Sequence, residues 1–354
     1  MEIRINEEFL NQVVEKILKN KNVFGVALCV ESGNHKFSWS GEGGNIKKDD
    51  KYFITSVSKL CVSAIVLHLR SRNFIRLTDP INHYLSDYVM DGLHVLNGVD
   101  YSREITVGQL LSNTSGIPDY LSVKQASGKT ADFELNQGID QCWTLEKVLE
   151  SVKKQKPRFK PGQRGKVHYS NTNYRLLGLI IEQITGKTIN NVFKEYIFDE
   201  LSLKKTYAYL DTNDKTPVTM YYKTNEIHIH GCMASVTAEG GIVSNAVETM
   251  IILKAFFNGH FFPMEDLEEL KKWNFIFFPY QFYFGIGLEK LWVPWVISPK
   301  KSIKEILGFW GSSGAFAFHN TDTDLYFTGT VNQWNGFGHK AAYKAMIEII
   351  KAAS

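Results

Sequence analysis

The chain has 354 residues, of which 44% are hydrophobic and 22% charged, which is typical of a soluble globular protein with a substantial core. Its formal net charge of +3 is too small to indicate nucleic acid or an anionic membrane as a partner. The sequence has no run of 18 apolar residues and no basic segment leading into an apolar one at its start. We therefore expect no transmembrane helix, no signal peptide and a cytoplasmic location.

The N-terminal segment predicts a helix followed by a β-hairpin. Residues 7–20 place apolar side chains at helical spacing. Residues 23–32 are typical of a strand, and Gly33-Asn34 supplies a turn to a return strand over 35–40. Glycines between 41 and 44 are expected to close the hairpin.

Helices dominate the middle of the sequence. A long apolar helix is expected from Ser56 onward, and Thr106 is a predicted helix N-cap. Gly186 has the position of a C-terminal helix glycine. Residues 122–141 are polar and predict a flexible surface loop. The remaining predicted helices cover residues 106–111, 145–152, 176–186, 189–199 and 247–258.

Strands return near the C-terminus. Residues 308–319 and 325–332 predict two strands joined by a turn at 321–324, and residues 340–352 predict a final helix. The aromatic-rich stretch 273–296 is expected to form core and the wall of a cleft.

This order of elements predicts an α/β (α+β) fold in a single unit over residues 1–354. An antiparallel sheet would be built from about 1–52 and 280–354 and flanked by the terminal helices. A large, mostly helical insertion would cover about 53–279.

Ser56 and Lys59 form a Ser-x-x-Lys tetrad at the head of the long helix. Residues i and i+3 share one helix face, so the Lys59 amine can reach the Ser56 hydroxyl. The tetrad predicts a nucleophile with an adjacent base. Three other tetrads, which start at Ser151, Ser202 and Ser298, lie in Lys-rich polar surroundings, whereas eight uncharged residues follow Lys59.

Two further segments can complete a site. Tyr169-Ser-Asn171, the only Tyr-x-Asn of the chain, lies in a polar loop before a helix. Its tyrosine can relay protons, partly as a phenolate, although an exposed tyrosine and a helix N-cap explain the same residues. The glycines at 308, 311 and 314 indicate that the backbone comes close to another group there. A backbone N–H of this segment would then point at an oxyanion, although a bulged strand explains the same glycines.

Taken together, these motifs resemble the serine β-lactamase and penicillin-binding-protein superfamily, with its β-lactamase/transpeptidase-like fold. The resemblance is closest to the class C branch, which includes D-alanyl-D-alanine carboxypeptidases, D-aminopeptidases and esterases. It covers roughly residues 20–350 in sequence order. The segments that carry it include 77–81, 105–120, 161–162, 169–186 and 239–244.

The resemblance implies a role for each residue. Ser56 would be the acylated nucleophile, Lys59 and Tyr169 would share base and proton relay, and Asn171 would orient Lys59 or the substrate. The oxyanion hole would be the N–H groups of Ser56 and Ser312.

The third motif departs from the family, because Phe309, Trp310 and Gly311 stand where Lys-Thr-Gly or His-x-Gly is usual. A register shifted by one would match a Trp-Gly-Gly box and assign the oxyanion N–H to Ser313. In either register a carboxylate-binding cation is missing, which favours neutral substrates.

The expected activity is therefore hydrolysis of a small ester or amide through a Ser56 acyl-enzyme, without cofactor. The alternatives are a β-lactamase or D-alanyl-D-alanine carboxypeptidase, and a non-catalytic protein that binds penicillin or a peptide. The substrate would be a small molecule or short peptide, and the sequence leaves the oligomeric state open.

Metal and disulfide sites are not expected. The four cysteines, at 29, 61, 142 and 232, form no Cys-x-x-Cys pair and predict reduced thiols in a core. His228 and His230 would share one face of a strand, but the sequence offers them no third ligand.

Overall fold

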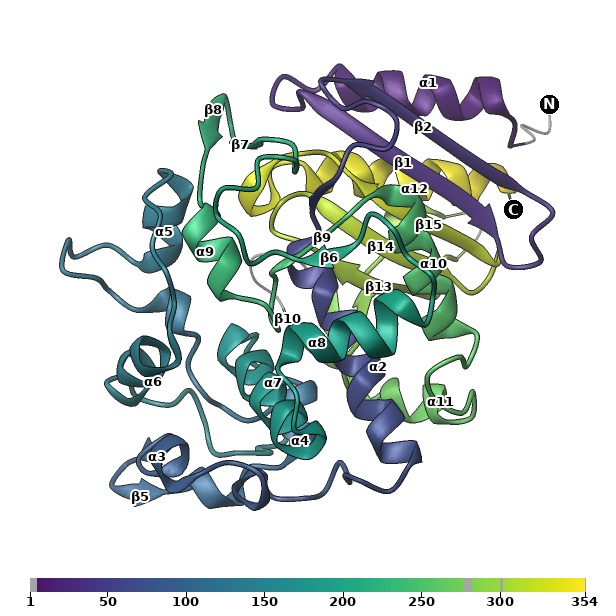
Figure 1. The fold of residues 1–354 in the computed structure, drawn as a ribbon. Coiled ribbons are helices and arrows are strands. Elements are labelled where there is room, and N and C mark those ends of the chain that lie inside the picture. The colour runs from purple at the N-terminus through teal and green to yellow at the C-terminus, as the bar shows by residue number, and fades with distance from the viewer. Residues whose placement is uncertain (1–4, 277–281, 300–301, 354) are drawn as a thin grey trace.

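The computed structural model describes residues 5–276, 282–299 and 302–353. Its largest element is an antiparallel eight-stranded sheet in the order β10-β11-β12-β13-β14-β15-β1-β2 (Figure 1). Pairing of β1 with β15 joins the two ends of the chain, as the sequence predicts. The strands are β1 Gly25–Ser32, β2 Ser38–Gly44, β10 Asn274–Ile276, β11 Phe282–Phe284, β12 Glu289–Leu291, β13 Ile306–Trp310, β14 Ala315–Asn320 and β15 Leu325–Thr330.

The two terminal helices, α1 (Glu7–Leu18) and α12 (His339–Ala353), pack against one face of this sheet (Figure 1). Helix α1 is amphipathic and buries the stripe Leu10, Val13, Val14 and Ile17. The side chains of one strand alternate between the two faces, so each central strand contributes to two separate cores.

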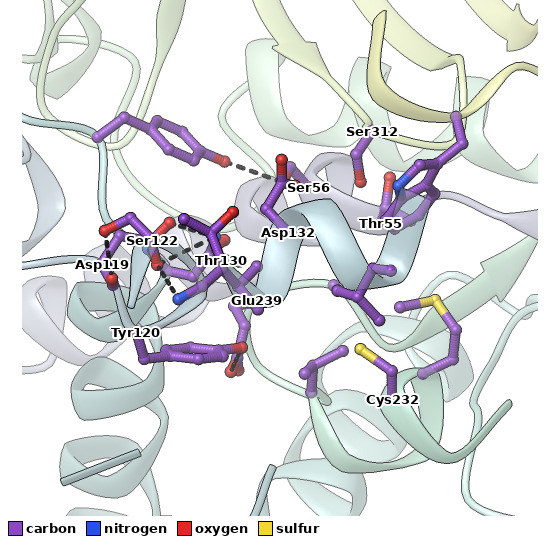
Figure 2. Close-up of a pocket in the computed structure, with 18 residues that line it drawn as sticks. Thr55, Ser56, Asp119, Tyr120, Ser122, Thr130, Asp132, Cys232, Glu239 and Ser312 are labelled. Carbon is purple, nitrogen blue, oxygen red and sulfur yellow. Dashed lines mark hydrogen bonds between the residues drawn. The ribbon is translucent and has the colours of Figure 1, made fainter. Parts of the chain in front are cut away.

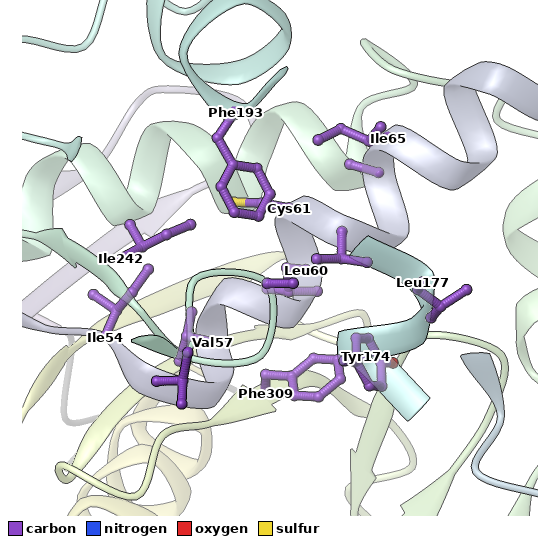
Figure 3. Close-up of a cluster of buried hydrophobic side chains, with 14 of the residues drawn as sticks. Ile54, Val57, Leu60, Cys61, Ile65, Tyr174, Leu177, Phe193, Ile242 and Phe309 are labelled. Carbon is purple, nitrogen blue, oxygen red and sulfur yellow. The ribbon is translucent and has the colours of Figure 1, made fainter. Parts of the chain in front are cut away.

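The opposite face of the sheet is covered by α10 (Ala246–Phe257) and α2 (Ser58–Ser71). Helix α2 is buried nearly all round, which explains its apolar sequence, and it packs between the sheet and α7 (Asn171–Thr185) (Figure 3). The remaining α-helices are α3 Asp87–Met90, α4 Val107–Leu111, α5 Ala131–Asn136, α6 Leu145–Lys153, α8 Ile189–Phe193, α9 His230–Ser235 and α11 Asp266–Leu270.

The other short strands form small sheets separate from the main one. A three-stranded sheet has the order β3-β9-β6, and two hairpins lie elsewhere in the helical region. The bounds are β3 Tyr52–Phe53, β4 Val95–Leu96, β5 Val99–Asp100, β6 Tyr207–Ala208, β7 Met220–Tyr222, β8 Asn225–Ile227 and β9 Ile242–Ser244.

Several local predictions are confirmed, and others are wrong. Thr106 caps α4 with a full capping box, and Gly186 ends α7 in the left-handed conformation. The return strand of the hairpin is residues 38–44, so its glycines lie within the strand. The C-terminal part of the main sheet begins with β10 at Asn274, whereas the sequence predicts about 280.

Two corrections concern segments that reach the site. The predicted loop 122–141 contains α5, because Thr130 caps the helix and Ala131 and Leu135 are buried beneath it. The predicted strand 308–319 is divided into β13 and β14 by a tight turn over 311–314.

Candidate active site

Ser56 lies in a single 3-10 turn, Thr55–Val57, that leads directly into α2. The turn is fixed because the Ile54 N–H donates to the Ile242 carbonyl at 3.0 Å. Lys59 stands one turn later on the same face, and its Nζ is 2.9 Å from the Ser56 Oγ. The contact predicted from the tetrad is therefore present in the folded chain.

Lys59 is fully buried and makes three polar contacts. Besides Ser56, its Nζ lies 2.9 Å from the Asn171 Oδ1 and 2.6 Å from the Glu239 carbonyl oxygen. Burial lowers the pKa of Lys59 to about 8, against the opposing effect of nearby carboxylates, Glu239 first. A neutral Lys59 keeps two N–H groups for Asn171 and Glu239 and can direct its lone pair at the Ser56 hydroxyl.

Tyr169 contacts the other side of the nucleophile. Its hydroxyl donates to the Ser56 Oγ at 2.9 Å, and its ring meets Phe284 edge-on at 5.9 Å between centroids. Burial, with the Glu289 carboxyl nearby, raises the pKa of Tyr169 well above its usual value. The structure therefore argues against the expected phenolate character, and Tyr169 is suited to donate a proton.

Asn171 is oriented by a residue to which sequence reasoning gave no role. The Asp119 carboxylate accepts the Asn171 backbone N–H at 3.2 Å and its side-chain Nδ2 at 3.3 Å. With its amide nitrogen held in this way, Asn171 turns its Oδ1 toward Lys59. Burial raises the pKa of Asp119 to about 6, so the group is ionised at neutral pH.

Glu239 is a second site residue without a role in the sequence analysis. Its backbone carbonyl accepts from Lys59, while its carboxylate Oε1 accepts from the Tyr120 hydroxyl at 3.0 Å. Arg175 lies 2.9 Å from the same carboxylate oxygen. In the sequence, the segment 239–244 indicates only a family resemblance. Its contact with Lys59 is made by a backbone carbonyl, so no pattern of side chains predicts it.

The third motif places its two aromatic residues on opposite faces of β13. Phe309 is fully buried on the α2 side and packs near Tyr174 and Phe284 (Figure 3). Trp310 faces the terminal helices and stacks on His339, so its side chain lies on the face of β13 that is turned away from α2. The backbone N–H of Trp310 donates to the buried Glu289 carboxyl, and burial raises the pKa of that carboxyl to about 8.

The turn after β13 approaches the nucleophile through its backbone. Ser312 lines the same pocket as Ser56, and Figure 2 shows it near Thr55. Among the described residues, no protein acceptor is found for the N–H of Ser56 or Ser312. The Ser313 N–H donates to the Thr55 Oγ1 at 3.2 Å, and the Ser313 hydroxyl donates to the Phe53 carbonyl. The N–H that the shifted register assigns to the oxyanion hole is therefore already used.

Gly311→Ala is expected to destabilise the protein by about 1–3 kcal/mol, the usual cost of overpacking a tight site. A Cβ at 311 would lie 2.4 Å from the Ile54 carbonyl oxygen and 2.5 Å from the Thr55 Oγ1. Urea denaturation measures the change. Gly240→Ala is the matched control, since its Cβ would come no closer than 3.6 Å to Thr55, and equal losses in the two variants would contradict the prediction.

A pocket of about 370 Å³ opens above Ser56 (Figure 2). Asp119, Asp132 and Glu239 are among the residues that line it, and the Glu239 carboxylate is paired with Arg175. No Lys, Arg or His is among the described lining residues. The lining residues are Thr55, Ser56, Asp119, Tyr120, Leu121, Ser122, Thr130, Asp132, Leu135, Tyr169, Asn171, Cys232, Met233, Val236, Glu239, Gly240, Ser312 and Trp334.

The candidate metal ligands His228 and His230 do not line this pocket. His228 and His230 stack at 6.2 Å between ring centroids, and the described ranges contain no cluster of three metal-ligating side chains. All four cysteines are free thiols; Cys142 is exposed, which corrects its expected place in a core. No helix in the described part of the chain has the length and apolar character to cross a membrane.

Comparison with known proteins identifies the family of this chain. The family model described as Beta-lactamase matches residues 10–350. The D-alanyl-D-alanine-carboxypeptidase/endopeptidase AmpH of Escherichia coli (strain K12) is 25% identical over 328 residues, 87% of this chain and 80% of AmpH. Protein flp of Staphylococcus aureus (strain MW2) is 24% identical over 60% of this chain, which spans only 40% of flp.

Solved structures share the whole fold. A D-stereospecific amidohydrolase from Streptomyces sp. has a TM-score of 0.77 at 24% identity and covers 96% of this chain and 98% of its own. EstCE1, a hydrolase with promiscuous acyltransferase activity, has a TM-score of 0.78 at 17% identity, covering 98% of this chain and 97% of its own. At these identities the likeness confirms the fold, with its antiparallel sheet and helical insertion.

Proposed function

Because the chain belongs to the β-lactamase family of hydrolases, we propose that it hydrolyses a small ester or amide through an acyl-enzyme on Ser56. The observation that carries the proposal is the double contact on the nucleophile: the Lys59 Nζ and the Tyr169 hydroxyl each lie 2.9 Å from the Ser56 Oγ. One group can accept the serine proton while the other donates to the leaving group.

The proposed sequence of steps follows from these contacts. Neutral Lys59 takes the Ser56 proton as the Oγ attacks the substrate carbonyl carbon. The N–H groups of Ser56 and Ser312 stabilise the oxyanion. Tyr169 donates its proton to the departing alcohol or amine, and the proton that Lys59 took from Ser56 then restores the Tyr169 hydroxyl. Water then attacks the acyl carbon, and the same groups release Ser56.

The polarity of the pocket supports a substrate without a carboxylate. The cation usual in the third motif is replaced by buried Phe309, and the described wall residues provide carboxylates and no cation. Asp132 is half-buried on this wall, and its described partner is the side-chain amide of Asn335 at 3.5 Å. An acyl group that bears a protonated amine would meet a complementary charge there.

A direct test compares substrates. The protein is incubated with a chromogenic short-chain ester, a chromogenic cephalosporin and a fluorophosphonate probe, and the intact mass is followed. We expect ester turnover and a single covalent adduct on the Ser56 peptide. Faster cephalosporin hydrolysis would overturn the substrate choice, and an adduct without turnover would favour the non-catalytic binding alternative.

Asp132→Asn is expected to lower kcat/KM for an alanine ester with a free amine by about tenfold, the value of one charge-assisted contact. The N-acetylated ester should change little, since it carries no charge for Asp132 to bind. Glu150→Gln, at an exposed position of α6, is a control for loss of a carboxylate. Equal losses on both esters would contradict a role for Asp132 in recognising the amine.

A further inference from the structure

The turn between β13 and β14 is held from the terminal-helix side by His339, the first residue of α12. The Nε2 of His339 lies 2.8 Å from the Gly311 carbonyl oxygen. The imidazole is buried and stacks on the Trp310 indole, with 4.4 Å between centroids and 20° between planes. A carbonyl oxygen can only accept, so the Nε2 carries the proton in this contact.

The direction of one carbonyl fixes the direction of the next N–H. The Gly311 carbonyl and the Ser312 N–H belong to the same planar trans peptide unit and point in opposite directions. The carbonyl points toward His339, beneath the turn, while Ser312 lies on the pocket wall with Ser56. The Ser312 N–H is thus directed away from α12, toward the side of the turn where the pocket lies.

We propose that His339 is a positioning residue for the oxyanion hole, holding the 311–312 peptide so that the Ser312 N–H faces the developing oxyanion. This inference rests on the proposed function of Ser56. A donor on the Gly311 carbonyl also polarises the peptide and strengthens its N–H as a hydrogen-bond donor. His339 does not touch the substrate and acts only through this peptide.

Two other contacts restrain the same turn and limit the size of the effect. The Gly314 N–H donates to the Gly311 carbonyl at 3.0 Å, and the Asn335 N–H donates to the Ser312 carbonyl at 2.6 Å. Loss of His339 would therefore loosen and depolarise the peptide without releasing it. Removing an oxyanion donor outright costs about 10²–10³-fold in kcat, and we expect about tenfold here.

The test compares His339→Leu, which removes the donor, with His339→Gln, whose side-chain amide nitrogen can replace the Nε2. His339→Leu should lower kcat for the chromogenic ester about tenfold with little change in KM, and weaken a boronic acid transition-state analogue by a similar factor. His339→Gln should recover most of both. His319→Leu is the control, since His319 is also buried but contacts Tyr326 and Asp324, outside the pocket wall.

The outcomes separate the two proposals. Wild-type kcat and boronate affinity in a folded His339→Leu variant would overturn the inference while leaving ester hydrolysis by Ser56 intact. Equal losses in His339→Leu and His339→Gln would also overturn it, because packing alone would then explain the effect. A wild-type protein without esterase activity would overturn both proposals.

A measurement on the wild-type protein remains available should His339→Leu not fold. Burial lowers the pKa of His339 to about 4, so its ring is neutral at assay pH. Ring ¹⁵N chemical shifts distinguish the two neutral tautomers. An Nε2–H tautomer for His339 supports the contact with the Gly311 carbonyl, and an Nδ1–H tautomer contradicts it.

Discussion

Replacing Ser56 by alanine is expected to lower kcat for ester hydrolysis by about 10⁴-fold or more, the loss typical of removing an enzyme's nucleophile. No other hydroxyl is placed to receive both the Lys59 and the Tyr169 contacts among the described residues. Stopped-flow and steady-state assays with the chromogenic ester measure the loss. The fluorophosphonate adduct should disappear with it.

Ser151→Ala is the matched control for this variant. Ser151 and Lys154 have the same Ser-x-x-Lys spacing, but they lie at the end of α6, where Lys154 is exposed and pairs with Glu150. This variant should keep wild-type activity and labelling. Ester hydrolysis that survives in Ser56→Ala would show that another group is the nucleophile.

Replacing Lys59 by methionine is expected to lower kcat by about 10³-fold, within the range of general-base catalysis. Methionine fills a similar apolar space, so the buried helix keeps its packing while the base is lost. The variant should retain the Ser56 hydroxyl and the pocket. Slow adduct formation with the fluorophosphonate, measured by intact mass over hours, reports the loss independently of turnover.

The same residue sets the expected pH dependence. Burial lowers the pKa of Lys59 to about 8, and the proposed base is its neutral form. The protein therefore gains activity as the pH rises through about 8 and loses it as the pH falls, with a tenfold decrease per unit well below this value. Values of kcat/KM measured from pH 6 to 10 test this rise in activity.

Lys154→Met, in the exposed tetrad, is the control and should leave both rate and profile unchanged. If the residual activity of Lys59→Met still falls as the pH drops through about 8, a group other than Lys59 causes that fall. A wild-type profile that is flat between pH 6 and 9 would contradict the neutral-lysine mechanism.

The sequence predicts the nucleophile and its base because their contact is local. Ser56 and Lys59 are three residues apart, and an apolar helix fixes their relative position without help from the rest of the fold. The same holds for the terminal helices and the Thr106 capping box, which depend on neighbouring residues. The sequence links Tyr169 and Asn171 to Ser56 only through family resemblance, since more than 100 residues separate the two motifs.

Other features depend on contacts that no local pattern encodes. Asp119 and Glu239 meet Asn171 and Lys59 only after α2 and α7 pack together, and one of these contacts is made by a backbone carbonyl. Helix α5, which forms where the sequence predicts a flexible loop, brings Asp132 to the pocket wall. The chemistry of the pocket wall is therefore a property of the packed structure.

The third motif shows most clearly which features follow from the sequence and which only the tertiary structure decides. Its residues alone indicate that an aromatic residue stands in place of the usual cation and that the backbone at Gly311 comes close to another group. Strand register decides that Phe309 faces the core beside Tyr174, that Trp310 faces the terminal helices, and that Ser312 reaches the pocket. A shift of one residue would exchange these faces, and pairing of β13 with both β12 and β14 fixes the register.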